Sequence, residues 1–441
     1  YGGTQDDATV YGPAKEWNAD APDPWKYLWI DPWNGGDGCV SQVDPVDSQI
    51  VFYSAQHGAA VRLDKSGDTA TEIMPSLPKG SKDTLRFNYI TPYFISPHDH
   101  ATLYHGGNFI FKSTAHGDDW KVISPDLSRS SIPAKRSVAA GALVESRIIK
   151  GLLYAGMDKG ACWVTNNDGR YWWEISNGLA NAYIRSICPS RFREDRVYLA
   201  MTGINQDDLH AYLYRSDDMG AHWTNISAGL PDEPVNVVLE DPVQEDIIYA
   251  GGLRGVYVSM DRGGTWNLLG KDMPQAAVAD MEVHEPTMDL VVATHGRGMY
   301  RLNLRPLHET REPVWNAGVD HLMALGDVRG PRQNTTGGGV DKRSVEKLPV
   351  DFWLAEKGEV VLAVMDVSGQ EVWQQRVKGE KGFNTFRWDL VTKRQESDLP
   401  YFTAYETYLK PGSYTMTLKV DEEVVHVLSR PFKVVPSGKV E

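Results

Sequence analysis

The sequence predicts an all-β fold: a β-propeller of about seven four-stranded blades, followed by a small Ig-like β-sandwich. Three observations lead to this prediction. Apolar residues alternate with a period of two in most segments, and helical periodicity is nearly absent. One pattern of strands and turns recurs along the first 304 residues, at spacings of 43 to 52 residues. Each copy holds about four strands, and four strands in such a period are typical of propeller blades.

The repeat can be followed through one anchor position in each copy. An apolar run leads into a turn such as DPVDS or DPVQED, and a β-rich strand then ends at a glycine before a second alternating strand begins. The anchors of the seven copies are Tyr1, Tyr53, Tyr104, Tyr154, Tyr198, Tyr249 and Val292.

The two terminal copies are incomplete. The first lacks its innermost strand, and the seventh, which ends at Leu304, lacks its outermost. Because a circular stack of sheets needs both edges paired, we expect that the missing strands come from sequence before Tyr1, or that the two terminal parts complete one shared blade. The chain is therefore expected to be the C-terminal part of a longer protein.

A turn motif of the form Ser-x-Asp-x-Gly-x-x-Trp occupies the same place in several copies. Full matches are Ser216, Asp218, Gly220 and Trp223, and Ser259, Asp261, Gly263 and Trp266. Two near matches have Ala115 and Asn167 in place of the aspartate. The aspartate can accept bonds from turn amides, the glycine tolerates positive φ, and the tryptophan can pack between blades. The motif resembles the Asp-box (BNR repeat) of sialidases, xyloglucanases and sortilin-type propellers, which implies a structural role on the face opposite the ligand site.

The rest of the chain is predicted to form a linker over residues 305–346 and a small antiparallel sandwich over residues 347–437. Its strands are separated by turn signals such as Ser368-Gly369 and Pro411-Gly412. This segment resembles the flagellar-hook-capping type of Ig-like module at the ends of exported bacterial proteins, through Asp366, Gly369, Val372, Asn384, Trp388, Asp389, Pro411, Gly412 and Tyr414. With HGRGMYRL at 295–302, the layout resembles exported bacterial proteins described as repeat-containing glycosyl hydrolases, which implies a secreted or cell-envelope location.

Composition excludes some partners. The net charge of −14 and the pI of about 5.4 disfavour a nucleic-acid or anionic-lipid surface. No stretch approaches the roughly 18 apolar residues that a membrane span needs. The three cysteines give no disulfide framework, so that Cys162 and Cys188 either form one pair or remain free thiols.

The blade topology assigns candidate ligand-binding residues to one face. The connections between second and third strands, and those between blades, should share a face, while the Asp-boxes lie on the other. Residues on the first face are Asp6, Asp7, Asp37, His57, Asn88, Tyr89, Arg136, Asp158, Arg185, Arg254, His295 and Arg297, together with Trp25, Trp29 and Trp33. The tryptophans could stack on sugar rings, anchor a partner protein, or pack over the propeller edge.

Two aspartates are the candidate catalytic pair. Hydrolysis of a glycoside needs two carboxyl groups about 5 to 9.5 Å apart. Asp37 in GGDG and Asp158 in GMDKGACWV lie in loops that resemble the catalytic loops of xyloglucanases, although in that family the carboxylates face each other across a cleft between two propellers. The alternative, that both aspartates cap glycine-rich turns, stays open. A sialidase is disfavoured because SRIIKG has Ile149 where the sialidase signature has proline.

No metal or cofactor is predicted. His98 and His100 lie in the turn SPHDHAT, and His116 lies in an Asp-box on the face opposite the predicted ligand site. Together with His105 they show no fixed ligand spacing, so we expect ordinary surface histidines. Calcium in a carboxylate-lined turn such as DPVDS is an open alternative.

The sequence thus predicts an exported binding or scaffolding propeller that holds a glycan or protein at its loop-rich face. The alternative is a glycoside hydrolase of xyloglucanase type, acting on β-glucans with a second propeller that completes the cleft. A third interpretation is an assembly subunit of an envelope complex, with a preceding propeller or other envelope subunits as partners.

Overall fold

The computed structural model describes residues 1–13, 22–29, 36–270, 273–309, 319–331, 340, 345–395, 405–420 and 427–436. Nearly all of its regular structure is β-strand, so the all-β prediction is confirmed. The one α-helix in this part of the chain, α1, spans only Arg305–Glu309. None of the described residues forms a helix of the length and apolarity that crossing a membrane requires.

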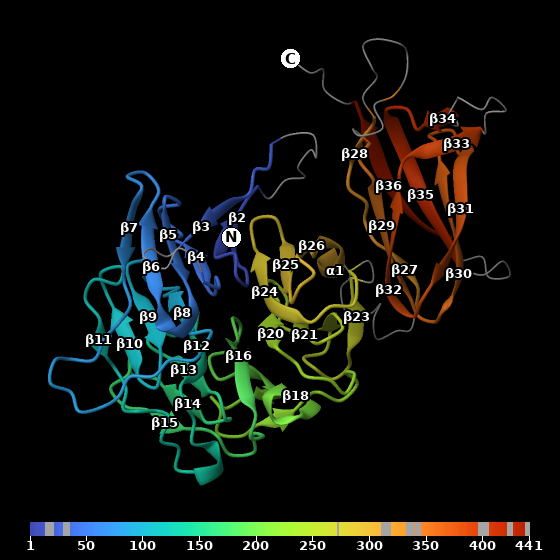
Figure 1. The fold of residues 1–441 in the computed structure, drawn as a ribbon. Coiled ribbons are helices and arrows are strands. Elements are labelled where there is room, and N and C mark those ends of the chain that lie inside the picture. Colours follow the sequence, from blue (N-terminus) through green and yellow to red (C-terminus); the bar gives the residue numbers. More distant parts are fainter. Residues whose placement is uncertain are drawn as a thin grey trace. The chain divides into compact units, whose positions relative to one another are not determined.

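The described chain divides into two compact units. The first comprises Tyr1–Trp266, Gln275–Val283 and Val291–Tyr300, and the second comprises Asn267–Pro274, His284–Leu290 and Arg301–Glu441. Figure 1 shows the sheets of the first unit side by side around a common centre.

Seven sheets follow one another from Gly2 to Asn303 in the described residues, and within each sheet neighbouring strands are consecutive in the chain. The first sheet holds β1 (Gly2–Gly3), β2 (Thr9–Tyr11) and β3 (Lys26–Leu28). The second holds β4 (Ser41–Val43), β5 (Ile50–Ser54), β6 (Ala60–Asp64) and β7 (Thr69–Glu72), and the third holds β8 (Tyr93–Ile95), β9 (Leu103–Gly106), β10 (Ile110–Ser113) and β11 (Lys121–Val122).

The next four sheets repeat this order. The fourth holds β12 (Ala140–Glu145), β13 (Leu153–Met157), β14 (Cys162–Thr165) and β15 (Trp173–Glu174), and the fifth holds β16 (Tyr183–Pro189), β17 (Val197–Gly203), β18 (Asp208–Ser216) and β19 (Thr224–Asn225). The sixth holds β20 (Val237–Glu240), β21 (Ile248–Gly251), β22 (Val256–Ser259) and β23 (Asn267–Leu269), and the seventh holds β24 (Val278–His284), β25 (Asp289–Thr294) and β26 (Met299–Asn303). Three 3-10 turns, η1 (Gln56–Gly58), η2 (Pro133–Lys135) and η3 (Ile204–Gln206), lie in the connections.

The second strands of the third to sixth blades are buried on both faces because a neighbouring sheet covers each face. All five residues of β13 and all seven of β17 are buried. This explains why these strands are continuous apolar runs and do not alternate with polar residues. Separate apolar clusters fill the spaces between successive sheets, such as the cluster around Tyr104 and Leu153 and the cluster around Tyr198 and Ile248.

The backbone hydrogen bonds correct one anchor of the repeat. The Asp44 amide donates to the Ile50 carbonyl oxygen, and the Asp241 amide donates in the same way to Ile247. Two residues further on, Phe52 therefore matches Tyr249, and the predicted anchor Tyr53 is wrong by one residue. Because side chains alternate across a strand, this shift moves Tyr53 to the other face of β5, where its hydroxyl donates to the Trp29 carbonyl oxygen at 2.9 Å.

The first and seventh sheets are separate three-stranded sheets in the described residues, and they do not form one shared blade. They are nevertheless neighbours. A Cβ atom added at Gly2 would lie 3.3 Å from the Met299 sulfur. The ring of sheets in the first unit thus returns to its start at β1.

The second unit is built from two main sheets. One holds β27 (His321–Leu322), β29 (Leu348–Leu354) and β32 (Gly382–Trp388), and the other holds β28 (Val328–Arg329), β36 (Val427–Val435), β35 (Gly412–Val420), β30 (Gly358–Met365) and β31 (Glu371–Gly379). A further pair, β33 (Val391–Gln395) and β34 (Tyr405–Tyr408), lies beside them in the chain.

Side chains from both main sheets form one apolar cluster that includes Phe352, Leu362, Trp388 and Met416. The segment predicted as a linker differs from expectation, because α1, β27 and β28 all lie within residues 305–346 and both strands pair into these sheets. All three cysteines are free, so the alternative of a Cys162–Cys188 disulfide is wrong.

Candidate functional site

The Ser-x-Asp turns are closed by their own side chains. In the hairpin between β18 and β19, Ser216 Oγ donates to Asp218 Oδ1 at 2.7 Å and accepts from the Gly220 amide at 2.8 Å. Gly220 has φ of +91°, which glycine adopts without strain. The Trp223 indole donates to the Ile175 carbonyl oxygen of the preceding blade at 2.8 Å. The motif therefore fastens one blade to the next.

The turn between β22 and β23 has the same geometry. Ser259 Oγ donates to Asp261 Oδ1 at 2.7 Å and accepts from the Gly263 amide at 2.7 Å, and Gly263 has φ of +92°. The Trp266 indole donates to the Ile226 carbonyl oxygen at 2.9 Å. The carboxylates and indoles of both full motifs are therefore occupied by backbone and turn groups, as a structural role requires.

The near match with Ala115 obtains its carboxylate from a different position. Asp119 Oδ1 accepts from Ser113 Oγ at 2.6 Å, from the Thr114 amide at 2.8 Å and from the Ala115 amide at 3.1 Å. The hydrogen bonds from Ser113 and Thr114 lower the pKa of Asp119 to about 2. The two consecutive aspartates in GDDW are the sequence signal that Asp119 provides the carboxylate missing at position 115.

The predicted ligand residues lie in two kinds of connection. His57, Asp158, Arg254, His295 and Arg297 lie between the second and third strands of their sheets, and Asp6 and Asp7 lie between β1 and β2 of the first sheet. We call these seven residues the loop-rich face. Asp37 lies instead in the connection that enters β4, and Trp29 follows β3. Trp33 lies outside the described residues.

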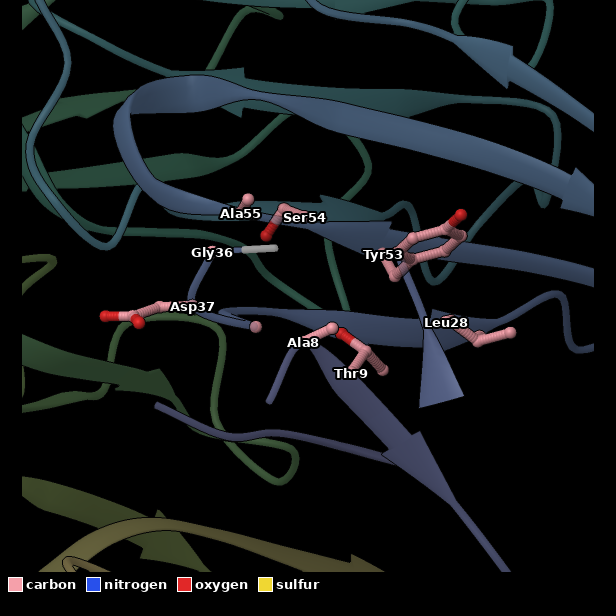
Figure 2. A pocket seen from close by; sticks show the side chains of 9 residues that line it. Ala8, Thr9, Leu28, Gly36, Asp37, Tyr53, Ser54 and Ala55 are labelled. Carbon is pink, nitrogen blue, oxygen red and sulfur yellow. The ribbon is translucent and has the colours of Figure 1, made fainter. Parts of the chain in front are cut away.

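Asp37 is the best-connected of these residues (Figure 2). Its Oδ1 atom accepts from the Asp6 amide at 2.8 Å, and its Oδ2 atom accepts from the Tyr89 hydroxyl. The Tyr89 bond lowers the pKa of the Asp37 carboxyl, and the same bond raises the pKa of Tyr89 to about 12. His57 joins this group, since its amide donates to the Tyr89 carbonyl oxygen at 3.0 Å and its ring meets the Tyr89 ring edge-on at 5.3 Å.

A small pocket lies beside Asp37. Its cavity volume is only about 10 Å³, and it is lined by Ala8, Thr9, Leu28, Gly36, Asp37, Gly38, Tyr53, Ser54 and Ala55 (Figure 2). Ligand pockets for small molecules usually enclose about 300 to 1,000 Å³. In Figure 2 the Asp37 carboxylate points away from the other labelled side chains. The pocket is therefore too small to enclose a sugar ring next to this carboxylate.

Asp158 has a separate role. Its Oδ1 atom accepts from the Val138 amide at 2.9 Å, and its own amide donates to the Ala139 carbonyl oxygen at 3.3 Å. Asp158 and Asp37 share no hydrogen-bond partner among the described residues. The structure thus gives each predicted catalytic carboxylate a local backbone contact and does not link the two.

The other predicted ligand residues differ in solvent exposure and in whether an ion pair holds their side chains. Arg254 Nε lies 3.1 Å from Glu233 Oε2, so an ion pair with a buried carboxylate holds this side chain. His295 and Arg297 are both exposed on the turn between β25 and β26. Asp6 and Asp7 are also exposed.

Aromatic side chains gather on the outer strand of the first sheet. Trp25, Tyr27 and Trp29 are 38%, 52% and 40% exposed, respectively. The Tyr27 and Trp29 rings stack with their centroids 6.1 Å apart. The stacked rings of Tyr27 and Trp29 form an aromatic row at the edge of β3, and Trp25 immediately precedes the strand. Sequence reasoning included both tryptophans but missed Tyr27.

Tyr183 and Asp280 were missed, whereas Arg185 was among the predicted residues. Arg185 of β16 lies with its guanidinium carbon 5.7 Å from the Tyr183 ring centroid. Desolvation raises the pKa of the Asp280 carboxyl in β24, and the positive charge of Arg185 acts in the opposite direction. These residues lie in the first strands of their sheets. The sequence signal that could have identified them is a polar residue within an otherwise apolar segment.

The four histidines do not all lie on the surface as predicted. His105 is 1% exposed, its Nε2 lies 3.1 Å from the Gly58 carbonyl oxygen, and burial lowers its pKa to about 4. His98 Nε2 lies 2.8 Å from the Ser146 carbonyl oxygen. His100 and His116 are partly exposed and lie together, with ring centroids 5.2 Å apart. Their spacing in the sequence gave no sign of this, because the two turns meet only after the blades have formed.

Comparison with solved structures identifies the architecture. No protein-family model and no curated protein sequence matches the chain. The chain is similar to the GH74 xyloglucanase from Xanthomonas campestris, with a TM-score of 0.52 and 16% identity over 79% of this chain and 58% of that one. The fold is a β-propeller. The chain spans about 58% of the length of this xyloglucanase.

Two further likenesses are weaker. PorZ, a bacterial surface component of the type-IX secretion system of Porphyromonas gingivalis, gives a TM-score of 0.42 and 10% identity over 90% of this chain and 51% of that one. YCF48 from Cyanidioschyzon merolae gives 0.40 and 14% identity over 60% of this chain and 82% of that one.

Proposed function

We propose that the protein is an exported or cell-envelope component whose propeller binds a glycan, and that it acts by recognition and not by catalysis. The observation that carries this proposal is the state of Asp37. Both of its carboxylate oxygens accept hydrogen bonds from the chain itself, from the Asp6 amide and the Tyr89 hydroxyl. A carboxylate held in this way stabilises a loop, and each of its oxygens already uses one acceptor site on the chain itself.

The aromatic row supplies the binding chemistry. Flat, partly exposed rings such as those of Tyr27 and Trp29 can stack on the apolar faces of sugar rings. The exposed side chains of Asp6, Asp7 and His57 add groups that can bond to hydroxyls. Export is supported by the resemblance of the C-terminal segment to Ig-like modules of exported bacterial proteins.

A glycan array probed with the full chain tests the proposal. We expect binding to a restricted set of oligosaccharides, and a loss of affinity of about tenfold or more in Trp29→Ala, since aromatic contacts contribute about 0.5 to 1.5 kcal/mol beyond the area they bury. Trp173→Ala is the matched control, because Trp173 is 42% exposed on the outer strand of the fourth sheet. Equal loss in both variants contradicts a site at Trp29.

A protein ligand is the competing outcome. Crosslinking of the full chain to envelope fractions would then recover a partner whose capture depends on Trp29 while the glycan array shows no binding. That combination would make the glycan proposal wrong and would leave the aromatic row as a protein-binding surface.

A glycoside hydrolase of xyloglucanase type, acting on β-glucans with a second propeller completing its cleft, is the second candidate. One observation favours it: the fold is similar to that of a GH74 xyloglucanase. Turnover of β-glucans by the parent chain, lost in Asp37→Asn and in Asp158→Asn, would show catalysis and contradict the binding-only proposal.

A further inference from the structure

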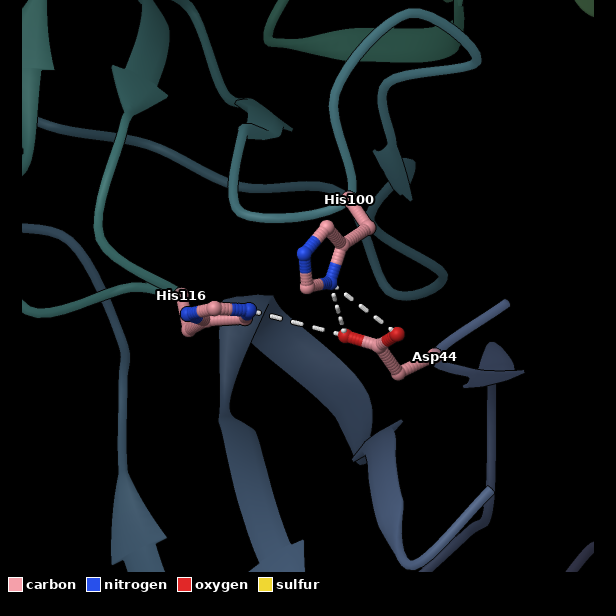
Figure 3. Close-up of side chains that lie close together, drawn as sticks. All are labelled: Asp44, His100 and His116. Carbon is pink, nitrogen blue, oxygen red and sulfur yellow. Dashed lines mark hydrogen bonds and ion pairs between the residues drawn. The ribbon is translucent and has the colours of Figure 1, made fainter. Parts of the chain in front are cut away.

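Three side chains of the second and third blades meet on the face that carries the Ser-x-Asp turns (Figure 3). Asp44 follows β4, His100 lies in the turn between β8 and β9, and His116 lies in the turn between β10 and β11. His100 Nδ1 is 2.9 Å from Asp44 Oδ2 and 3.1 Å from Oδ1, and His116 Nε2 is 3.5 Å from Asp44 Oδ2. All three possible ligand atoms lie within 4.8 Å of one another.

The repeat itself shows that this arrangement is unusual. Asp241 is the counterpart of Asp44 in the sixth blade, and its Oδ1 atom accepts from the amides two and three residues later, as Asp44 Oδ1 also does. Asp241 Oδ2 accepts from the Tyr249 hydroxyl at 2.6 Å. Phe52 occupies the Tyr249 position in the second blade and has no hydroxyl to donate. Asp44 Oδ2 is therefore turned toward the two histidines.

The backbone fixes His116 toward Asp44. His116 has φ of +52°, the left-handed conformation that Asp168, Met219 and Arg262 adopt at the equivalent position of the other turns. Its amide donates to the Ala101 carbonyl oxygen at 2.9 Å, and its carbonyl oxygen accepts from Arg62 Nη1 at 2.9 Å. Its ring lies parallel to the Phe52 ring, with centroids 6.3 Å apart and an interplanar angle of 5°. The imidazole thus has a defined position before any ligand binds.

The carboxylate of the cluster is buried and its two imidazoles are partly exposed, an arrangement that suits a bound cation. The Asp44 side chain is fully buried, while the side chains of His100 and His116 remain 38% and 31% exposed. A buried carboxylate requires a compensating positive charge or hydrogen bonds. The exposed side of the two imidazoles would let an ion enter from solvent and keep a water molecule.

We propose that Asp44, His100 and His116 bind a divalent transition-metal ion, with zinc as the ion of first choice. Two imidazole nitrogens and one carboxylate oxygen are ligands that zinc accepts, at about 2.0 to 2.2 Å, with water in the fourth position. Tetrahedral ligands at those lengths lie roughly 3.3 to 3.5 Å apart. His116 Nε2 already lies 3.5 Å from Asp44 Oδ2, and His100 Nδ1, at 2.9 Å, would move outward by a few tenths of an ångström. The ion would join the second blade to the third.

Zinc titration of the metal-stripped full chain, followed by calorimetry, tests the site. We expect one zinc ion per chain, and a loss of affinity of about tenfold or more in His100→Ala and in His116→Ala because each removes one of three ligands. His222→Ala is the matched control, since His222 lies in the equivalent turn of the fifth blade, is 90% exposed and pairs with Asp218. An equal loss in His222→Ala, or unchanged affinity in the other two variants, overturns the proposal.

Phe52→Tyr provides a test that does not remove a ligand. Because four other blades carry tyrosine at this position, the variant should fold, and its hydroxyl should cap Asp44 Oδ2 as Tyr249 caps Asp241. We expect zinc to raise the melting temperature of the parent but not of Phe52→Tyr. Cobalt(II) added to the parent should give the absorption of a four-coordinate ion. A parent whose melting temperature does not respond to zinc, or a Phe52→Tyr variant that binds zinc as tightly as the parent, overturns the proposal.

Discussion

The Trp266 indole nitrogen donates a hydrogen bond of 2.9 Å to the carbonyl oxygen of Ile226, which lies 40 residues earlier and belongs to the preceding blade. Trp266 is 9% exposed, so this bond forms away from water. Equivalent bonds run from Trp120 to Ile73, from Trp172 to Ile123 and from Trp223 to Ile175. The repeated tryptophan thus hydrogen-bonds each of these blades to the one before it.

Trp266→Phe should destabilise the protein by about 1 to 3 kcal/mol, because it leaves the buried Ile226 carbonyl oxygen without its donor. The change in the midpoint of urea unfolding measures this loss. Trp173→Phe is the control, since Trp173 is 42% exposed and should change stability by less than about 0.5 kcal/mol. If both variants unfold at the parent midpoint, the indole bond contributes nothing to the join between blades.

Asp119→Asn should reduce stability in a way that depends on pH. The pKa of Asp119 in the folded protein is about 2, against 3.8 for an ordinary aspartate. A group whose folded-state pKa is lowered stabilises the fold above its unfolded value, and that contribution disappears as pH falls through the folded value. The difference in unfolding free energy between parent and variant should be constant near pH 7 and shrink between about pH 4 and pH 2.

Asp118→Asn serves as the neighbouring control. Asp118 is 56% exposed and pairs with Arg62 at 3.0 Å, and exposed ion pairs contribute only about 0 to 1 kcal/mol. If the parent–variant difference in unfolding free energy has the same size and pH dependence for both substitutions, Asp119 does not replace the motif aspartate that is missing at position 115.

Tyr89→Phe should raise the pKa of the Asp37 carboxyl, because the Tyr89 hydroxyl bond is the largest cause of its lowering. A carboxyl-carbon NMR titration of the parent and the variant measures the shift directly. The Asp6 amide bond remains in the variant, so the pKa should return only part of the way to the ordinary value. An unchanged Asp37 pKa would show that the phenol does not bond to this carboxylate in solution.

Local chemistry made part of this structure predictable. Ser216, Asp218, Gly220 and Trp223 form a turn whose bonds lie within a few residues, so their spacing alone indicated the hairpin. The relation of Asp37 to Tyr89 spans 52 residues, and that of Asp44 to His100 spans 56. Contacts of this range depend on how turns of neighbouring blades meet, and no spacing within one turn encodes that. The one-residue error at Tyr53 arose because two adjacent aromatic residues fit the same alternating pattern.

Gly156→Ala tests how closely the fourth and fifth blades approach. A Cβ atom at Gly156 in β13 would lie 2.3 Å from Ile184 Cγ2 and 3.1 Å from Ile187 Cδ1, and both isoleucines belong to β16. Overpacking of this kind costs about 1 to 3 kcal/mol. Ile184→Ala removes the clashing methyl group, so the double variant should be more stable than the sum of the two single losses predicts. Gly358→Ala meets nothing within 4 Å and should leave the unfolding midpoint almost unchanged. Strict additivity of the two substitutions would mean that β13 and β16 are not in direct contact at this position.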